Sequence, residues 1–263
     1  MSQPASTEQL DPSPTAPALR IDDLHFRYTG DTEALRGVHL HVQPGRKVAL
    51  LGASGAGKST LLLHLNGVHL PERGKIFLGD TEVSPANLRT IRQRVGLVFQ
   101  DPDDQLFHLT VGEDVAFGPR NFGLGAATVE QRVRQALAAM RLEGFEDRLN
   151  QHLSFGERRR VSLATVLVMQ PELLALDEPF ANLDPRMVHT LMGIVRDFPG
   201  TVMLASQDML PALGCCDEAA ILLDGSIAAH APVADIAGDR DLLKRCGLDF
   251  WYLADVLDQL RQR

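Results

Sequence analysis

Cysteine and long apolar runs are both scarce in this sequence. Its 263 residues include only three cysteines, two of them adjacent at Cys215 and Cys216. Three are too few for the disulfide framework of a secreted domain, so we expect a reducing, cytoplasmic compartment. The cysteines also lack the spacing of a metal site. No apolar run approaches the length of a membrane span and the first residues lack a signal-type apolar stretch, so we expect any membrane association to be peripheral, through a partner.

Positive charge is also in short supply. The chain has 26 Lys and Arg residues against 34 Asp and Glu, which gives a net charge of −8. The one short basic run, residues 158–160, is equally typical of a solvated helix face. This balance argues against nucleic acid as a partner. Hydrophobic residues make up 44% of the chain, so it can bury the core of one α/β domain or of a domain with a subdomain.

A glycine-rich stretch lies between two apolar runs, residues 48–51 and 61–65. The order of strand, Gly-x4-Gly-Lys-Ser and helix is typical of a phosphate-binding loop, and an ordinary glycine-rich turn is the weaker reading. Glycines let successive backbone N–H groups surround a polyphosphate, and the helix start adds a favourable dipole. The predicted loop comprises Gly52, Ala53, Ser54, Gly55, Ala56, Gly57, Lys58, Ser59 and Thr60. Lys58 is expected at the β- and γ-phosphates and Ser59 on Mg²⁺.

Polar side chains follow two further apolar runs. Residues 95–99 end at Gln100, and residues 173–176 end at Asp177 and Glu178. Ligands bind at the carboxyl ends of parallel strands, so both ends are candidate sites. The first carboxylate is expected near Mg²⁺ and the second near an attacking water. Gln100 is either a ligand of Mg²⁺ or of that water, or an ordinary loop glutamine.

Three other positions have a structural interpretation, and two of them, Ser154 and Tyr28, also have a ligand-binding one. Ser154 followed by Glu157 is the capping-box pattern of a helix start. Asp184 precedes Pro185 as a helix cap does. Tyr28 ends an alternating strand, where it either stacks on a base or shares the apolar face of Leu24 and Phe26.

The remaining pattern indicates how the chain is organised. Residues 1–18 are rich in Pro, Ser and Thr and are predicted to be a disordered tail. Two antiparallel strands are expected before the strand at 47–51, and a hairpin at 219–229. Residues 101–165 are expected to form a helical subdomain, with an apolar helix face in 128–142. Residues 103–107 are either a surface for another protein or a solvated loop. Two helices, 239–246 and 251–261, are expected in the tail.

The order of these motifs resembles that of ATP-binding-cassette transporter ATPases, over roughly residues 19–231. The runs VGLVFQDPDDQLF and TVGEDVAFG, at 95–107 and 110–118, are similar to the energy-coupling-factor and cobalt/nickel group. The resemblance implies an α/β P-loop NTPase fold with a mixed or parallel core sheet, an N-terminal antiparallel β subdomain and a helical subdomain. Residues 232–263 would be a C-terminal helical tail.

The resemblance also implies ATP and Mg²⁺ as ligands. By position, Tyr28 corresponds to the adenine-stacking aromatic and residues 52–60 to the phosphate cradle. Ser59, Gln100 and Asp177 would surround Mg²⁺, and Glu178 would be the general base. Ser154, Gly156 and Glu157 would face the ATP of another subunit, and Asp184 would couple the two sites.

The implied function is that of a motor subunit for import of a cobalt or nickel ion or a vitamin. Its partners would be a second ATPase subunit, identical or different, and an integral membrane subunit. The chain would therefore lie at the cytoplasmic face of the membrane.

Three residues depart from the family pattern. Phe155 stands where Gly is common and Glu157 where Gln is common. Gln207 stands where the family has a switch histidine that contacts the γ-phosphate, and it cannot carry that positive charge. We expect reduced but measurable ATPase activity. The alternative is an ATP-binding, weakly hydrolysing subunit of a heterodimer in which the partner does most of the hydrolysis.

Overall fold

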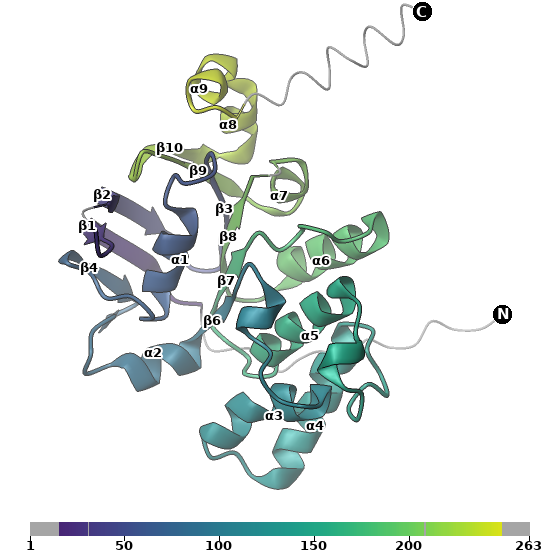
Figure 1. Ribbon diagram of the computed structural model, residues 1–263. Helices are drawn as coiled ribbons and strands as arrows, with labels where there is room; N and C mark the ends of the chain where they lie inside the picture. The colour runs from purple at the N-terminus through teal and green to yellow at the C-terminus, as the bar shows by residue number, and fades with distance from the viewer. Residues whose placement is uncertain (1–15, 31, 208, 249–263) are drawn as a thin grey trace, which may run out of the picture.

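The computed structural model describes residues 16–30, 32–207 and 209–248 (Figure 1). Most of the predicted disordered tail and the predicted helix at 251–261 lie outside these residues. The predicted tail extends to residue 18, yet Pro17 is buried and its carbonyl accepts a hydrogen bond from Thr201 Oγ1 at 3.0 Å. Within the described residues, no helix has the length and apolar character needed to cross a membrane.

The N-terminal part forms an antiparallel sheet of four strands in the order β2-β1-β4-β5. Side chains in β1 alternate between the buried face and solvent at its start, as Leu19 and Ile21 show. The predicted antiparallel pair at the N-terminus is confirmed by the pairing of β1 with β2. The strands are β1 (Leu19–Arg27), β2 (Glu33–Val42), β4 (Arg73–Leu78) and β5 (Thr81–Glu82).

A second sheet has six strands in the order β10-β9-β3-β8-β7-β6. Strands β9, β3, β8, β7 and β6 are parallel, and β10 pairs antiparallel with β9 in the predicted hairpin. The predicted mixed core sheet is therefore confirmed. The strands are β3 (Lys47–Leu51), β6 (Val95–Val98), β7 (Leu173–Asp177), β8 (Thr201–Ser206), β9 (Glu218–Leu223) and β10 (Ser226–Pro232).

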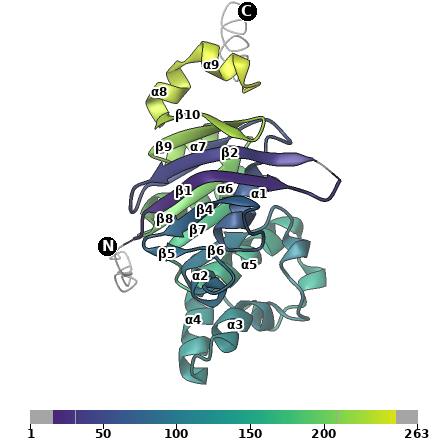
Figure 2. The same ribbon diagram turned by 90° about the vertical axis from the view of Figure 1, so that its left-hand side faces the viewer.

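Helices cover both sheets and extend the molecule at two ends. Helices α3, α4 and α5 pack on one another at one end, and α8 and α9 lie at the opposite end (Figure 2). Helix α9 confirms the predicted helix at 239–246, whereas α8 was not expected. The helices are α1 (Lys58–Leu65), α2 (Leu88–Arg94), η1 (Pro102–Asp104), α3 (Val111–Asn121), α4 (Ala126–Ala139), η2 (Asn150–His152), α5 (Phe155–Leu167), α6 (Pro185–Asp197), α7 (Met209–Cys215), α8 (Val233–Gly238) and α9 (Arg240–Arg245).

Both faces of the core sheet are buried, in two separate apolar cores. In β3, Val48 and Leu50 join the core that contains α1 and the antiparallel sheet. Ala49 and Leu51 join the core on the opposite face, which includes residues of α3 to α7. Continuous apolar strands with alternating sides are what a sheet buried on both faces requires.

The parallel register brings four strand ends to one edge of the core sheet. Leu51 of β3 pairs with Ser206 of β8, and Asp177 of β7 pairs with Ala205. Val98 of β6 pairs with Leu176 of β7. The polar residues that follow these strands therefore share one edge, which is where the sequence placed the site.

Candidate functional site

The glycine-rich loop between β3 and α1 has the backbone shape that an anion site requires. Gly57 has a φ of 105°, and a side chain there would meet Ala34 O at 2.7 Å. A side chain at Gly52 would meet Leu222 O at 2.5 Å. Helix α1 begins after Gly57 with no side-chain cap, so the N–H groups of its first turn remain suited to an anion.

Lys58 connects this loop to the carboxylates of β7. Its side chain is buried, and Nζ donates to Gly52 O at 2.8 Å and to Ala53 O at 3.1 Å. Nζ also lies 3.9 Å from Glu178 Oε1. Burial lowers the pKa of Lys58, and the charges of Glu178 and Asp177 oppose that shift. The structure thus brings together the loop and the carboxylate pair that the sequence predicted.

Asp177 and Glu178 are both buried at the end of β7. Burial raises the pKa of Asp177, and a hydrogen bond with Ser59 opposes the rise. Asp177 Oδ1 and Glu178 Oε1 are buried without a hydrogen-bond partner among the described residues. A carboxylate oxygen without a hydrogen bond, as in Asp177, beside a hydroxyl is a suitable donor set for Mg²⁺, which prefers oxygen ligands. Asp177 and Ser59 therefore fit the predicted metal site.

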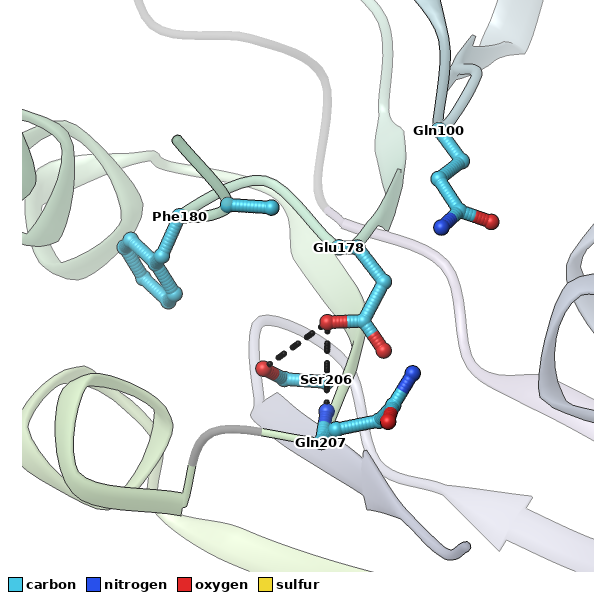
Figure 3. A pocket seen from close by; sticks show the side chains of 6 residues that line it. Gln100, Glu178, Phe180, Ser206 and Gln207 are labelled. Atoms are coloured by element: carbon cyan, nitrogen blue, oxygen red, sulfur yellow. Dashed lines mark hydrogen bonds between the residues drawn. The ribbon is translucent and has the colours of Figure 1, made fainter. Parts of the chain in front are cut away.

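The Glu178 carboxylate is held from one side by the end of β8 (Figure 3). Its Oε2 accepts from Ser206 Oγ at 3.3 Å and from the Gln207 backbone N–H at 3.1 Å. Its own backbone has a φ of 45°, in the left-handed region, and its N–H donates to Ala205 O at 2.9 Å. Sequence reasoning did not assign Ser206 to the site. The only signal was its place next to Gln207 at a strand end.

A cavity of about 250 Å³ lies beside Glu178. It brings together three residues that the sequence selected from separate strands, Gln100, Glu178 and Gln207, as Figure 3 shows. Phe180, Ala181 and Ser206 complete the lining. The cavity therefore lies at the shared strand edge, and one of its lining residues is the Glu178 that Lys58 approaches.

Tyr28 lies next to the end of the phosphate loop. Its hydroxyl is hydrogen-bonded to Thr60 Oγ1 at 3.1 Å, and 38% of the residue is exposed. The ring meets Phe26 edge-on at a centroid distance of 5.0 Å. Both sequence interpretations fit this position, because the ring packs on the strand face and also stays accessible beside the loop. Adenine stacking remains a prediction.

The capping interpretations of Ser154 and Asp184 are confirmed. Ser154 Oγ caps Glu157 N–H at the start of α5, and Glu157 Oε2 accepts from the Ser154 N–H at 2.8 Å. The bonds that Ser154 donates to this carboxylate from its N–H and its hydroxyl lower the pKa of Glu157. Asp184 caps α6 by accepting from the N–H groups of Arg186 and Met187. No hydrogen bond among the described residues joins Ser154, Gly156 or Glu157 to the phosphate loop of the same chain.

Comparisons with known proteins agree with this geometry. The family described as ABC transporter matches residues 35–181. A protein of Geobacter sulfurreducens whose name assigns it to ABC transporter ATP-binding proteins is 47% identical over 231 residues, 88% of this chain and 93% of that protein. The energy-coupling factor transporter ATP-binding protein EcfA of Methanothermobacter thermautotrophicus is 41% identical over 248 residues, 92% of this chain and 80% of that protein.

Solved structures show the same fold. The structure of cbiO1 from Clostridium perfringens, described as part of the ABC transporter complex cbiONQ, has a TM-score of 0.77 at 31% identity, over 92% of this chain and 99% of that one. A dimeric ATP-binding cassette bound to ADP and Pi shares the fold with a TM-score of 0.73 at 23% identity, over 82% of this chain and 98% of that one. The predicted fold class is confirmed, and the chain belongs to the ABC transporter family as an ATP-binding protein.

Proposed function

We propose that the chain is the ATP-hydrolysing motor subunit of a membrane importer for a small solute. The observation that carries this proposal is the approach of Lys58 Nζ to Glu178 Oε1 at 3.9 Å. It joins the phosphate loop to the carboxylate pair of β7. Transfer of a phosphoryl group to water needs both parts, one to position the phosphates and one to orient the attacking water.

The phosphate loop would bind the triphosphate through its backbone. The start of α1 has no side-chain cap, so the N–H groups of its first turn would face the phosphates without competition from a capping side chain. Lys58 adds a point charge at the β- and γ-phosphates. Its bonds to Gly52 O and Ala53 O hold the ammonium over the loop. Tyr28, anchored on Thr60, would stack on adenine.

Asp177, Ser59 and Gln100 would hold Mg²⁺. The unpaired Asp177 Oδ1 supports this assignment, as does the exposed Gln100 side chain on the same cavity as Glu178. The charge of a cation held by these residues would stabilise the negative charge that develops on the phosphates during transfer.

Glu178 would act as the general base. Ser206 and Gln207 hold Oε2 and so fix the orientation of the carboxylate, while Oε1 has no hydrogen-bond partner among the described residues. Oε1 accepts a proton as the water oxygen bonds to the γ-phosphorus and the bond to ADP breaks. Gln207 would contact the γ-phosphate with its neutral amide.

The start of α5 would complete the site of a second subunit. Ser154, Gly156 and Glu157 have no bond to their own phosphate loop among the described residues, and Ser154 is exposed. We therefore infer a dimer with two composite sites, in which Asp184 couples one site to the other. The dimeric ATP-binding cassette of the same fold supports such an arrangement.

An apolar patch supports docking to a membrane subunit at the cytoplasmic face. Phe107, Leu109 and Phe117 form this patch and are 66%, 65% and 43% exposed. Along the chain, it follows the loop after β6, residues 99–105, which we call the Gln100 loop. The family names of EcfA and cbiO1 support an energy-coupling role, with a cobalt or nickel ion or a vitamin as cargo.

The proposal is tested by steady-state phosphate release from MgATP, with the purified full chain and with Glu178→Gln. We expect measurable turnover in the wild-type chain and a loss of more than about a hundredfold in Glu178→Gln, with MgATP still bound. Equal turnover rates near zero for both proteins would contradict the proposed motor function and favour the alternative function. That alternative is a nucleotide-binding subunit of a heterodimer, which the neutral Gln207 and the bulky Phe155 favour.

A further inference from the structure

Arg159 lies in α5 and is completely buried, with 0% of its surface exposed. Its guanidinium donates to backbone carbonyl oxygens from two different strand ends. Nη1 donates to Phe99 O and to Gln100 O, the latter at 2.9 Å. Nη2 donates to Asp177 O at 2.7 Å and to Glu178 O at 2.6 Å. One side chain thus bonds to the backbone of the Gln100 loop and of both carboxylate residues.

A buried cation is costly unless its N–H groups are bonded. Burial lowers the pKa of Arg159, and the charges of Asp177 and Glu178 oppose that shift. The planar fork of a guanidinium can serve several carbonyls at once, whereas a lysine ammonium is a compact point charge. Arginine therefore suits this position for a geometric reason. Its fork reaches carbonyl oxygens of both strand ends at the candidate site.

The bond to Glu178 O falls at a strained point of the backbone. Glu178 has a φ of 45°, which non-glycine residues rarely adopt. Its conformation determines where the carboxylate points, and the donor from Arg159 holds the carbonyl on the other side of the same residue. Glu178 O also accepts from Ala181 N–H at 3.2 Å, so removing the Arg159 donor takes away the shorter of two hydrogen bonds to this carbonyl and loosens the constraint on this peptide.

The Gln100 loop is tied to α5 at further points. Gln105 Nε2 donates to Ser162 O at 2.8 Å, and its Oε1 accepts from Phe99 N–H at 3.1 Å. Arg158 pairs with Asp103 at 3.0 Å. The Gln100 loop and α5 are therefore held together by several contacts. Arg159 in addition donates to the end of β7, at Asp177 O.

We propose that Arg159 is a positioning residue for hydrolysis. It fixes the backbone of Glu178 and Gln100 relative to α5. The general base is then aligned when the start of α5 faces a second nucleotide. This inference rests on the proposed ATPase function.

The test compares Arg159→Lys with Arg160→Lys in the full chain. Arg160 is a matched control, because it is the next residue of α5 and also donates to two backbone carbonyls, Met140 O and Arg141 O, away from the site. Turnover is expressed per MgATP-binding site, so that unfolded chains do not contribute. We expect Arg159→Lys to lower kcat by about ten- to a hundredfold with the MgATP Kd changed less than about threefold. Arg160→Lys should change kcat less than about twofold.

A double-mutant cycle with Glu178→Gln separates positioning from general destabilisation. If Arg159 acts through Glu178, Arg159→Lys should lower the residual rate of Glu178→Gln by less than about threefold. A full ten- to hundredfold loss in that background, or equal losses for the two lysine variants, would overturn the inference. So would failure of both Arg159→Lys and Arg159→Gln to bind MgATP. If the wild-type chain itself turns over no faster than Glu178→Gln, the proposed function fails instead.

Discussion

At the residue scale, the chemistry depends on how the two oxygens of Glu178 differ. Oε2 is held by Ser206 Oγ and Gln207 N–H, and Oε1 is left without a hydrogen bond among the described residues. A carboxylate bonded on one side presents a defined lone pair on the other, which is the geometry a general base needs. The end of β8 therefore orients the residue that β7 supplies.

Replacing Gln207 by histidine should raise the rate of hydrolysis. The bond from Gln207 to Glu178 uses the backbone N–H, so the substitution changes only the side chain, which we propose contacts the γ-phosphate. A charge-assisted hydrogen bond contributes roughly 1.5–3 kcal/mol, and its gain in the transition state corresponds to about a ten- to hundredfold increase in turnover. Phosphate release by Gln207→His, assembled with its membrane subunits, measures this. Unchanged turnover would show that residue 207 does not limit the reaction.

At the element scale, α1 serves both the site and the stability of the fold. His64 is buried in this helix, and its Nδ1 donates to Thr60 O at 2.7 Å. Its ring meets Phe26 of β1 edge-on at a centroid distance of 4.6 Å. The helix that presents the phosphate loop is thus packed against the antiparallel sheet through an imidazole that must stay neutral.

Burial lowers the pKa of His64 to about 4 from 6.5. Between these values the unfolded chain binds the proton and the folded chain does not, so stability falls as pH falls from 6.5 towards 4. From pH 7.5 to pH 5, His64 should cost about 2 kcal/mol of unfolding free energy. Urea denaturation of the wild type and of His64→Gln, which keeps a donor but does not titrate, measures this. Parallel pH profiles for the two proteins would contradict it.

Sequence patterns predicted the elements better than the contacts between them. The alternation of β1, the apolar run of β7 and the capping box at Ser154 are local signals, and each was confirmed. The roles of Ser206 and Arg159 depend on β8 lying beside β7 and on α5 packing over two strand ends. Such neighbours are set by tertiary packing. A solvated face was one of the two interpretations of residues 158–160, and it is wrong for Arg159, because this side chain is buried and its Nη atoms donate to backbone carbonyls.

At the scale of the whole molecule, the composite site that we propose has two parts in each chain. The phosphate loop lies at the edge of the core sheet with Asp177 and Glu178. The start of α5 carries Ser154 and Gly156, and no hydrogen bond among the described residues joins it to that loop. Two chains arranged head to tail would bring each α5 to the loop of the other chain, which explains why one sequence carries both parts.

The proposal that two chains share each ATP site is tested most directly by measuring phosphate release from a mixture of two inactive variants. Lys58→Ala removes the charge of the phosphate loop, and Gly156→Asp places a carboxylate at the start of α5. A side chain at Gly156 meets nothing within 4 Å in its own chain, so the fold should tolerate it.

Each variant alone should be nearly inactive. In a mixed dimer, the intact phosphate loop of the Gly156→Asp chain would face the intact α5 of the Lys58→Ala chain. We expect the mixture to recover part of the wild-type turnover. A mixture that stays at the average of the two separate rates, or a Lys58→Ala chain that keeps full turnover alone, would contradict the account.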